Sequence, residues 1–287
     1  TEVTEEQENN EILIKLLGDV YDFPWGKHMV GQEQTMHESL EKFSGYLEQR
    51  LQERPQVEIR VRQIVAYAYH QLGEHATARE HLQRALYLAG GEYGDVHETV
   101  ADILTEFADE IELQREKKSL AEDLTIAPFD QTKAQADAER ALSIYNQLHI
   151  ESLGKGHALF CLAWYVEPNL ERHVEAEGYL LQALQIAQDL ASGNDSYRQV
   201  YTMWDLVEHL TWQKTGGSEE AISLAQEAVA MSRRINGKES HITAGLIAER
   251  GECLRFQGDE EGALASYHEA WDIFQTISPP NDPLRHS

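Results

Sequence analysis

A pattern of small residues recurs five times along this chain at a nearly constant interval. Each copy begins with an alanine and has another alanine seven residues later, with a leucine, tyrosine or alanine at the fourth position between them. These spacings place all three residues on one face of a helix. The pattern predicts a helical unit copied along the chain, because each copy alone is too small to bury its apolar face. The leading alanines are Ala78, Ala134, Ala176, Ala221 and Ala263, at intervals of 56, 42, 45 and 42 residues.

Each copy is predicted to be a pair of helices joined by a turn. In the first copy Tyr69 belongs to the apolar seam of the first helix, Gly73 marks the turn, and Ala78 lies in the second helix. The fifth copy shows the pattern most fully, and its small residues, such as Gly251, let the two helices approach closely. We therefore expect an all-α solenoid of about five helix–turn–helix repeats that follows an N-terminal helical cap.

The expected boundaries follow the interruptions of this pattern. Residues 1–34 form an acidic segment, a short helix and a loop, residues 35–55 a capping helix, and residues 277–287 a proline-rich tail. The array covers 56–276, with repeats at 56–92, 97–150, 155–192, 197–236 and 239–276. The second repeat contains an insertion at 118–130, and loops of that length are often functional or mobile. Because the chain begins with Thr1, not methionine, we expect it to be a segment of a longer protein.

The charge of the chain narrows the classes of partner. Lys and Arg number 24 against 50 Asp and Glu, which gives a formal net charge of −26. Such a field repels nucleic-acid phosphates and anionic lipid headgroups and attracts basic partners, although a well-solvated helical surface also explains it. The longest apolar run without charges, residues 158–166, is too short to span a bilayer. We therefore expect neither nucleic-acid binding nor membrane insertion by this segment.

The sequence offers no recognisable set of residues for catalysis, metal binding or cofactor binding. Cys161 and Cys253 lie two repeats apart and are expected to be small core residues, not a disulfide. The 13 histidines show no metal-ligand spacing. Lys214-Thr215-Gly216 matches a triplet that serine acyl-enzymes carry on a strand, but here it falls in an expected turn between helices. We predict no metal, no cofactor and no enzymatic activity.

Two stretches of the chain resemble the tetratricopeptide (TPR) repeat. They are AYAYHQLGEHATAREHLQRAL in the first copy and GECLRFQGDEEGALASYHEAW in the fifth. Steps near 42 residues, longer than the usual TPR length of about 34, resemble the kinesin-light-chain-like variant with longer helices. The resemblance covers about residues 56–276. It implies a right-handed superhelix in which the first helix of each repeat lines a concave surface that binds a peptide or protein.

A second resemblance concerns the region before the array. The stretch NEILIKLLGDVYDFPWG, followed by TMHESLEKFSGYLEQRLQERPQVEIRVRQIVAYAYHQLGEHATAREHLQRAL, is similar to the C-terminal TPR region of certain bacterial membrane-bound serine/threonine protein kinases. In that family a kinase domain and a membrane helix precede the array. This chain has no glycine-rich kinase loop and no HRD or DFG motif. The resemblance therefore implies a sensor or interaction region, not a catalytic one.

The candidate binding residues are those on the inner face of each first helix, counted outward from its apolar seam. The aromatic residues of the third repeat and the first two of the fourth should converge into a binding hot spot, with Glu208 and Asp109 adding negative charge nearby. The alternative is that these rings pack against the neighbouring first helix. The candidates are Arg60, Gln63, Tyr67, His70, Asp102, Asp109, Phe160, Trp164, Tyr201, Trp204, Glu208, Trp212, Glu252 and Arg255.

We expect a non-catalytic scaffold that binds a protein or peptide with an apolar anchor and a basic flank. The kinase resemblance implies that this scaffold is the sensor or interaction region of a kinase-linked bacterial receptor. The alternative is a self-association module, a homodimer that brings attached catalytic domains together. The mass of such a module would depend on concentration, whereas a scaffold would stay monomeric.

Overall fold

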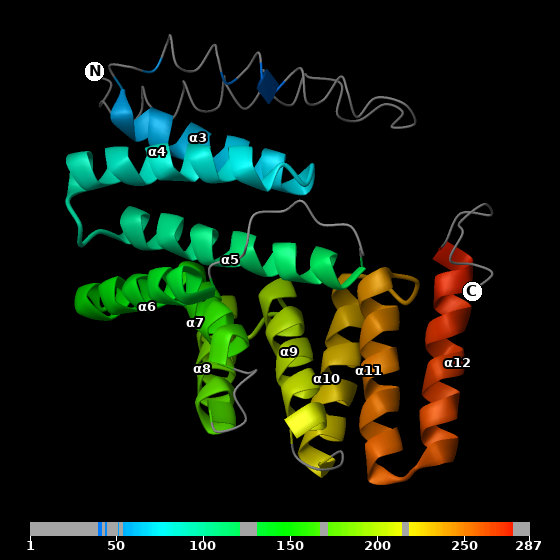
Figure 1. The fold of residues 1–287 in the computed structure, drawn as a ribbon. Helices are drawn as coiled ribbons and strands as arrows, with labels where there is room; N and C mark the ends of the chain where they lie inside the picture. The colour runs from blue at the N-terminus through cyan, green and yellow to red at the C-terminus, as the bar shows by residue number, and fades with distance from the viewer. Residues whose placement is uncertain are drawn as a thin grey trace, which may run out of the picture. The chain divides into compact units, whose positions relative to one another are not determined.

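The computed structural model describes residues 40, 41, 44, 51, 54–120, 131–166, 172–213 and 218–277. These residues contain ten helices and no strand (Figure 1). None of these helices is both long enough and apolar enough to cross a lipid bilayer. The predicted N-terminal segment, most of the predicted capping helix and nearly all of the predicted tail lie outside the described residues. The helices are α3 (Pro55–Gln71), α4 (His75–Tyr93), α5 (Glu98–Leu120), α6 (Gln131–Leu148), α7 (Leu153–Val166), α8 (His173–Ala191), α9 (Tyr197–Gln213), α10 (Glu219–Ile235), α11 (His241–Gln257) and α12 (Glu260–Ile277).

The helices belong to two compact units, Thr1–Ile150 and Glu151–Ser287. Within the first unit α3 packs against α4, α4 against α5, and α5 against α6. Two backbone hydrogen bonds close the turn between α3 and α4, from Gly73 to the carbonyl of His70 and from Glu74 to the carbonyl of Tyr69, each 2.9 Å long. The turn predicted at Gly73 is therefore observed. The predicted insertion begins inside α5, which continues to Leu120, and its remainder lies outside the described residues.

The second unit consists of three helix pairs, α7–α8, α9–α10 and α11–α12 (Figure 1). The pairs stack because α8 packs against α9 and α10 packs against α11. The first helices α9 and α11 also contact each other directly. The predicted succession of helix pairs is thus confirmed, and adjacent first helices form one face of this unit.

The leading alanine of every copy is buried. Ala134, Ala176 and Ala221 have no exposed surface, and Ala78 and Ala263 are only 1% and 3% exposed. A side chain this small lets two helix backbones approach at the packing position. The small residues recognised in the sequence are therefore helix-packing positions.

The helices of the last pair have a point of close approach at Gly251 of α11. A methyl group on Gly251 would lie 2.7 Å from Cε1 of Tyr267 and 3.2 Å from Cβ of Ser266, both on α12. The Tyr267 ring is held in place because its hydroxyl donates a 2.6 Å hydrogen bond to Glu252. α11 ends at Gln257, and Gly258 caps it with a φ of 88°, which is in the left-handed region that favours glycine.

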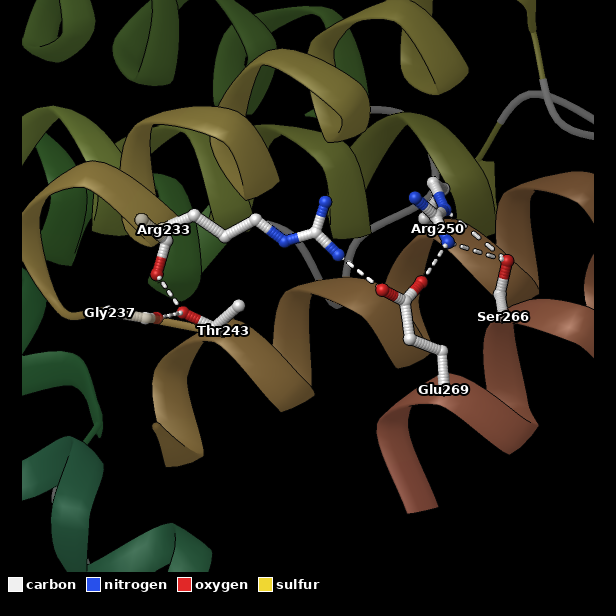
Figure 2. A network of polar contacts seen from close by, with 7 residues as sticks. Arg233, Gly237, Thr243, Arg250, Ser266 and Glu269 are labelled. Atoms are coloured by element: carbon white, nitrogen blue, oxygen red, sulfur yellow. Dashed lines mark hydrogen bonds and ion pairs between the residues drawn. The ribbon is translucent and has the colours of Figure 1, made fainter. Parts of the chain in front are cut away.

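Polar contacts join the last three helices (Figure 2). Glu269 of α12 accepts a 3.0 Å hydrogen bond from Arg250 of α11 and a second hydrogen bond from Arg233 of α10. Arg250 also donates to the hydroxyl of Ser266 at 3.2 Å. A single carboxylate thus connects three helices, through charge-assisted hydrogen bonds that are stronger than neutral ones.

The two cysteines are buried and free, as the sequence predicts. Both have no exposed surface. The Sγ atom of Cys253 lies 3.0 Å from the hydroxyl oxygen of Thr211, which links α11 to α9. Both residues serve as small core residues at helix contacts.

Replacing Gly251 with leucine should destabilise the second unit, because the added side chain overlaps Tyr267 and Ser266. Overpacking a filled core costs about 1–3 kcal/mol. The midpoint of urea unfolding should fall, and the loss of hydrogen-exchange protection should concentrate in α11 and α12. An unchanged midpoint would show that this contact does not limit the packing.

Gly178 of α8 is the matched control for this substitution. It lies inside a helix, and an added methyl group would meet no atom within 4 Å. Gly178→Ala should therefore raise stability by up to about 1 kcal/mol through helix propensity alone. If Gly251→Leu and Gly178→Ala both destabilised the unit, close contact between helices would not explain why glycine is needed at Gly251.

Candidate functional site

In the first unit, several predicted inner-face residues already join neighbouring helices. Gln63 of α3 is buried, and its side-chain amide donates a 2.9 Å hydrogen bond to Glu106 of α5. Arg60 donates to the side-chain oxygen of Gln63 at 3.5 Å. Asp102 of α5 accepts a 2.6 Å hydrogen bond from the hydroxyl of Tyr145 on α6. Gln63 and Asp102, which were predicted to face a ligand, are therefore used in helix packing.

The other predicted residues of the first unit differ in exposure. Tyr67 is 67% exposed on α3, so its ring faces solvent. His70 is half-buried, and its ring meets that of His75 edge to face at 5.1 Å. Asp109 is half-buried on α5. Among these, Tyr67 offers the apolar surface that a partner could cover.

In the second unit, the predicted aromatic residues of α7 pack against each other. Phe160 and Trp164 lie one turn apart, with their rings edge to face and their centroids 6.2 Å apart. Phe160 also packs against the hydrophobic core of the unit. Edge-to-face pairs of this kind contribute to packing beyond the area they bury.

The predicted anchor Trp204 packs between adjacent first helices. A methyl group on Gly245 of α11 would lie only 2.2 Å from Cη2 of the Trp204 indole on α9. The indole therefore occupies the space above Gly245, and it also contacts the core of the unit. The sequence analysis gave packing against the neighbouring first helix as the alternative to partner binding, and Trp204 makes such a packing contact. Phe160 and Trp204 are both partly buried against the core, so helix packing uses part of each ring, and the binding hot spot of four aromatic residues stays a prediction.

Two exposed aromatic residues lie on α9, one before and one after Trp204. Tyr201 is 45% and Trp212 60% exposed on α9. The Trp212 ring meets Phe256 of α11 edge to face at 5.4 Å, and the guanidinium of Arg255 lies 4.4 Å from the centre of the Phe256 ring. We call Trp212, Arg255 and Phe256 the aromatic cluster. The sequence prediction missed Phe256, which directly follows a predicted residue.

Carboxylates from two first helices lie beside this cluster. Glu252 of α11 accepts hydrogen bonds of 2.6 Å from both Arg255 and Tyr267. Glu249, one turn earlier, was not predicted, and its Oε1 atom is buried with no hydrogen-bond partner among the described residues. Burial, and then the charges of Glu208 and Glu252, raise the pKa of Glu249 to about 7. Glu249 and Glu252 of α11 therefore share one electrostatic environment with Glu208 of α9.

Glu106 is the corresponding carboxyl group of the first unit. Burial raises the pKa of Glu106 to about 7, although the hydrogen bond from Gln63 acts in the opposite direction. The charges of Asp102 and Asp109 raise this pKa further, and that of Arg60 lowers it. Its spacing of four residues from Asp102 places Glu106 on the predicted face, but its burial depends on α3 and could not be known from the sequence.

A small recess opens between α7 and α9. Its volume is about 10 Å³, which is close to the space that one ordered water needs. Its lining combines an indole, two carboxylates, a buried histidine and two apolar side chains. The lining residues are Trp164 and Ala163 of α7, Leu180 of α8, and Asp205, Glu208 and His209 of α9.

Comparison with solved structures identifies the fold. BtubC (BKLC) from P. vanneervenii is 18% identical, with a TM-score of 0.65 over 88% of this chain and 93% of that one. A Podosopora anserina protein described as a kinesin light chain with nearly identical TPR-like repeats is 16% identical, with a TM-score of 0.58 over 77% of this chain and 97% of its own. The fold is a TPR-like helical repeat. The all-α solenoid class predicted from the sequence is thereby confirmed.

A third similar structure is a Rap protein complexed with Competence and Sporulation Factor. It is 14% identical, with a TM-score of 0.60 over 93% of this chain and 72% of the Rap chain. No family model and no curated protein sequence matches this chain. At these identities the similarity establishes the fold, and the site residues rest on the geometry described above.

Trp204→Ala should destabilise the second unit, by less than the about 3–5 kcal/mol that a fully buried tryptophan contributes, because the ring is partly buried. Gly245→Ala should also be destabilising in the wild-type protein, because the new methyl group collides with the indole. In a Trp204→Ala background, however, Gly245→Ala should be neutral or stabilising, because the space is then empty. A double-mutant cycle on urea unfolding measures this coupling. Additive effects would show that the two residues do not touch.

Stability should fall as pH rises from about 6.5 to 8. Glu249 and Glu106 have folded pKa values of about 7, above the ordinary 4.5, so the folded state holds protons that the unfolded chain releases. Stability from such groups is lost as pH rises through the folded pKa. The contribution of His81 to the free energy of unfolding depends on pH in the opposite way, because burial and then the charge of Arg62 lower its pKa to about 4. This contribution is lost as pH falls toward 4 and is nearly complete above the ordinary histidine pKa of about 6.5.

Glu249→Gln and Glu106→Gln should each flatten this pH dependence and raise stability at pH 8. Glu227→Gln, at an exposed carboxylate on α10, is the control with the same change in net charge. The measurement is the urea unfolding midpoint at several pH values. A wild-type midpoint that rises over this range, or a slope that neither variant changes, would contradict the assignment.

Proposed function

We propose that this chain is a non-catalytic scaffold that binds a peptide or protein segment along the first helices of its second unit. The observation that carries the proposal is the exposed aromatic cluster beside a carboxylate-rich face. Trp212 is 60% exposed although the core of its own helix is complete without it, since Met203, Leu206 and Leu210 are buried. Large aromatic residues with a polar tip are favoured binding anchors.

The chemistry of the face indicates the kind of partner. An apolar anchor would cover Trp212 and Phe256, and a basic flank would meet Glu208 and Glu249. Burial, and then the charges of Glu208 and Glu252, raise the pKa of Glu249 to about 7, and a cation nearby would favour its charged form. The formal charge of −26 favours the approach of such a partner over long range. The Rap protein with a similar fold is complexed with Competence and Sporulation Factor, which supports a ligand-holding role for an array of this kind.

The kinase-linked role rests on the sequence resemblance of residues 10–26 and 35–86. This resemblance supports the proposal that the scaffold is the sensor or interaction region of a kinase-linked bacterial receptor. An antibody raised against the second unit should then detect, in native cells, a membrane-associated polypeptide much larger than the 32.7 kDa of this chain. A native product of about this mass in the soluble fraction would remove the kinase linkage and leave the scaffold proposal intact.

Self-association is the second candidate function, and one observation favours it. Leu264 is 59% and Trp271 47% exposed on α12. Their spacing of seven residues places both on one side of the helix. A second copy of this chain could bury this side, and the unit would then be a homodimer.

Two variants, Trp212→Ala and Trp271→Ala, are each tested for peptide binding and for self-association, which separates the two proposed functions. The probe for binding is an array of immobilised random decapeptides. Trp212→Ala should weaken capture of the peptides that wild type binds by about thirtyfold, the loss of roughly 2 kcal/mol typical of a central anchor. Trp271→Ala should leave this capture unchanged.

Sedimentation at several protein concentrations tests the second function with the same two variants. If self-association is the function, wild type gains mass with concentration, Trp271→Ala abolishes the gain and Trp212→Ala keeps it. Circular dichroism should be unchanged in both variants because both rings are exposed. Equal peptide capture by wild type and Trp212→Ala would overturn the proposed binding face.

A further inference from the structure

The outer side of α12 differs from the equivalent side of the second helices before it. Equivalent positions are counted from the leading alanine of each helix. Eight residues after that alanine, Leu184 of α8 is 8% and Val229 of α10 is 2% exposed, whereas Trp271 of α12 is 47% exposed. One residue after it, Ile222 of α10 is partly buried against the core, whereas Leu264 of α12 is 59% exposed. Positions that are covered inside the stack are therefore uncovered on its last described helix.

The next first helix provides this cover inside the stack. α9 packs against α8, and α11 packs against α10. The α10–α11 contact includes the buried hydroxyls of Ser232 and Thr243, which lie 2.8 Å apart. α12 packs against α11 and is the last of the described helices (Figure 1). A terminal repeat needs a polar outer face for solubility, but α12 presents Leu264 and Trp271. This surface, which we call the end face, therefore has the composition of a stacking contact and not of a cap.

We propose that a second copy of this chain covers the end face, with the two α12 helices packed antiparallel about a twofold axis. The inference rests on self-association, the second candidate function, and specifies the surface and the orientation of the two copies. The axis passes midway between Leu264 and Trp271. Each Trp271 then covers Leu264 of the other copy, so the surface is complementary to itself, as a twofold interface requires.

The charges of α12 favour the antiparallel orientation. Its four carboxylates belong to Glu260, Glu261, Glu269 and Asp272. When residue 264 lies opposite residue 271 of the other copy, each carboxylate lies level with an uncharged residue. In the same order, these are Gln275, Phe274, Ser266 and Ala263. In a parallel pair each carboxylate would instead lie level with its own counterpart, and like charges repel each other.

The centre of the end face suits a second copy better than a basic partner. Leu264, His268, Trp271 and Gln275 follow one another at helical spacing, and none of them is a carboxylate. A basic partner would find no acidic group to pair with along this line. A second chain with the same formal charge of −26 meets less repulsion here than at a face rich in carboxylates. One helix from each copy makes a small interface, which is typical of weak, reversible association.

The test is sedimentation of the intact chain over a range of concentrations. The mass of the wild type should rise from 32.7 kDa to twice that value, with a dissociation constant of about 10 μM. Leu264→Lys and Trp271→Glu should each weaken association at least about tenfold, because each places a charge against an apolar side chain. Leu181→Lys changes an exposed leucine of α8 by the same charge, and it should alter the dissociation constant less than about twofold.

A mixture of the two variants tests the antiparallel orientation. In a mixed pair, the lysine introduced at 264 faces the glutamate introduced at 271, and the other end keeps the native contact of Trp271 with Leu264. Equal amounts of Leu264→Lys and Trp271→Glu should therefore associate within about threefold of the wild type. A parallel pair brings each position opposite itself, so mixing would create no ion pair. Circular dichroism should be unchanged in each variant, because both side chains are exposed.

The possible failures are distinguishable. If the wild type associates and Leu264→Lys and Trp271→Glu associate equally well, self-association uses another surface and this inference is wrong. If both variants associate weakly and their mixture does not recover, the antiparallel pairing is wrong. A wild type that stays at 32.7 kDa at all concentrations removes self-association together with this inference. The peptide scaffold, which the peptide array tests, would stand in all three cases.

Discussion

Close contact between neighbouring helices is the constraint on which this structure depends. At Gly251 and Gly245 an added methyl group would approach an aromatic carbon of the next helix to 2.7 Å and 2.2 Å. The leading alanines are buried at the corresponding positions of the second helices. A stack of helix pairs has no single globular centre, so each interface must be filled by the side chains of its own neighbours. Small residues set the distance between helices, and aromatic rings fill the remaining space.

This way of packing determines which inner-face residues are available to a partner. Trp204 lies where α9 and α11 touch, and its ring is used in the contact. Trp212, two turns later on the same helix, lies beyond that contact and remains 60% exposed, with Phe256 beside it. The same face also gathers carboxylates from adjacent helices, because equivalent positions of successive repeats are brought together. The pKa of Glu249 is raised first by its burial and then by the charges of two of these carboxylates, Glu208 and Glu252.

Much of the fold could be predicted from the sequence, because the repeat spacing and the small residues are local patterns. Gly73 was correctly predicted as a turn, Gly251 as a close contact, and Cys161 and Cys253 as buried core residues. The binding role of the candidate residues stays a prediction, but the structure shows which of them also contact other helices. Gln63 and Asp102 lie on the expected face, yet they bind Glu106 and Tyr145 of other helices. Helical periodicity shows which residues share a face, but it does not show how far the next helix covers that face.

The sequence by itself determined the class of the protein: helices in pairs, repeated about every 42 residues, with small residues at the contacts and a strong excess of acidic charge. These properties follow from the spacing and composition of a single chain, and no partner helix is needed to recognise them. The tertiary structure decided which aromatic rings are buried and which are exposed, and which carboxyl groups share one electrostatic environment. Trp204 and Trp212 look alike in sequence, and they differ because Gly245 offers space to one of them. The pKa of Glu249 likewise depends on burial and on Glu208, which is 41 residues away in the chain and close only after α9 and α11 have packed.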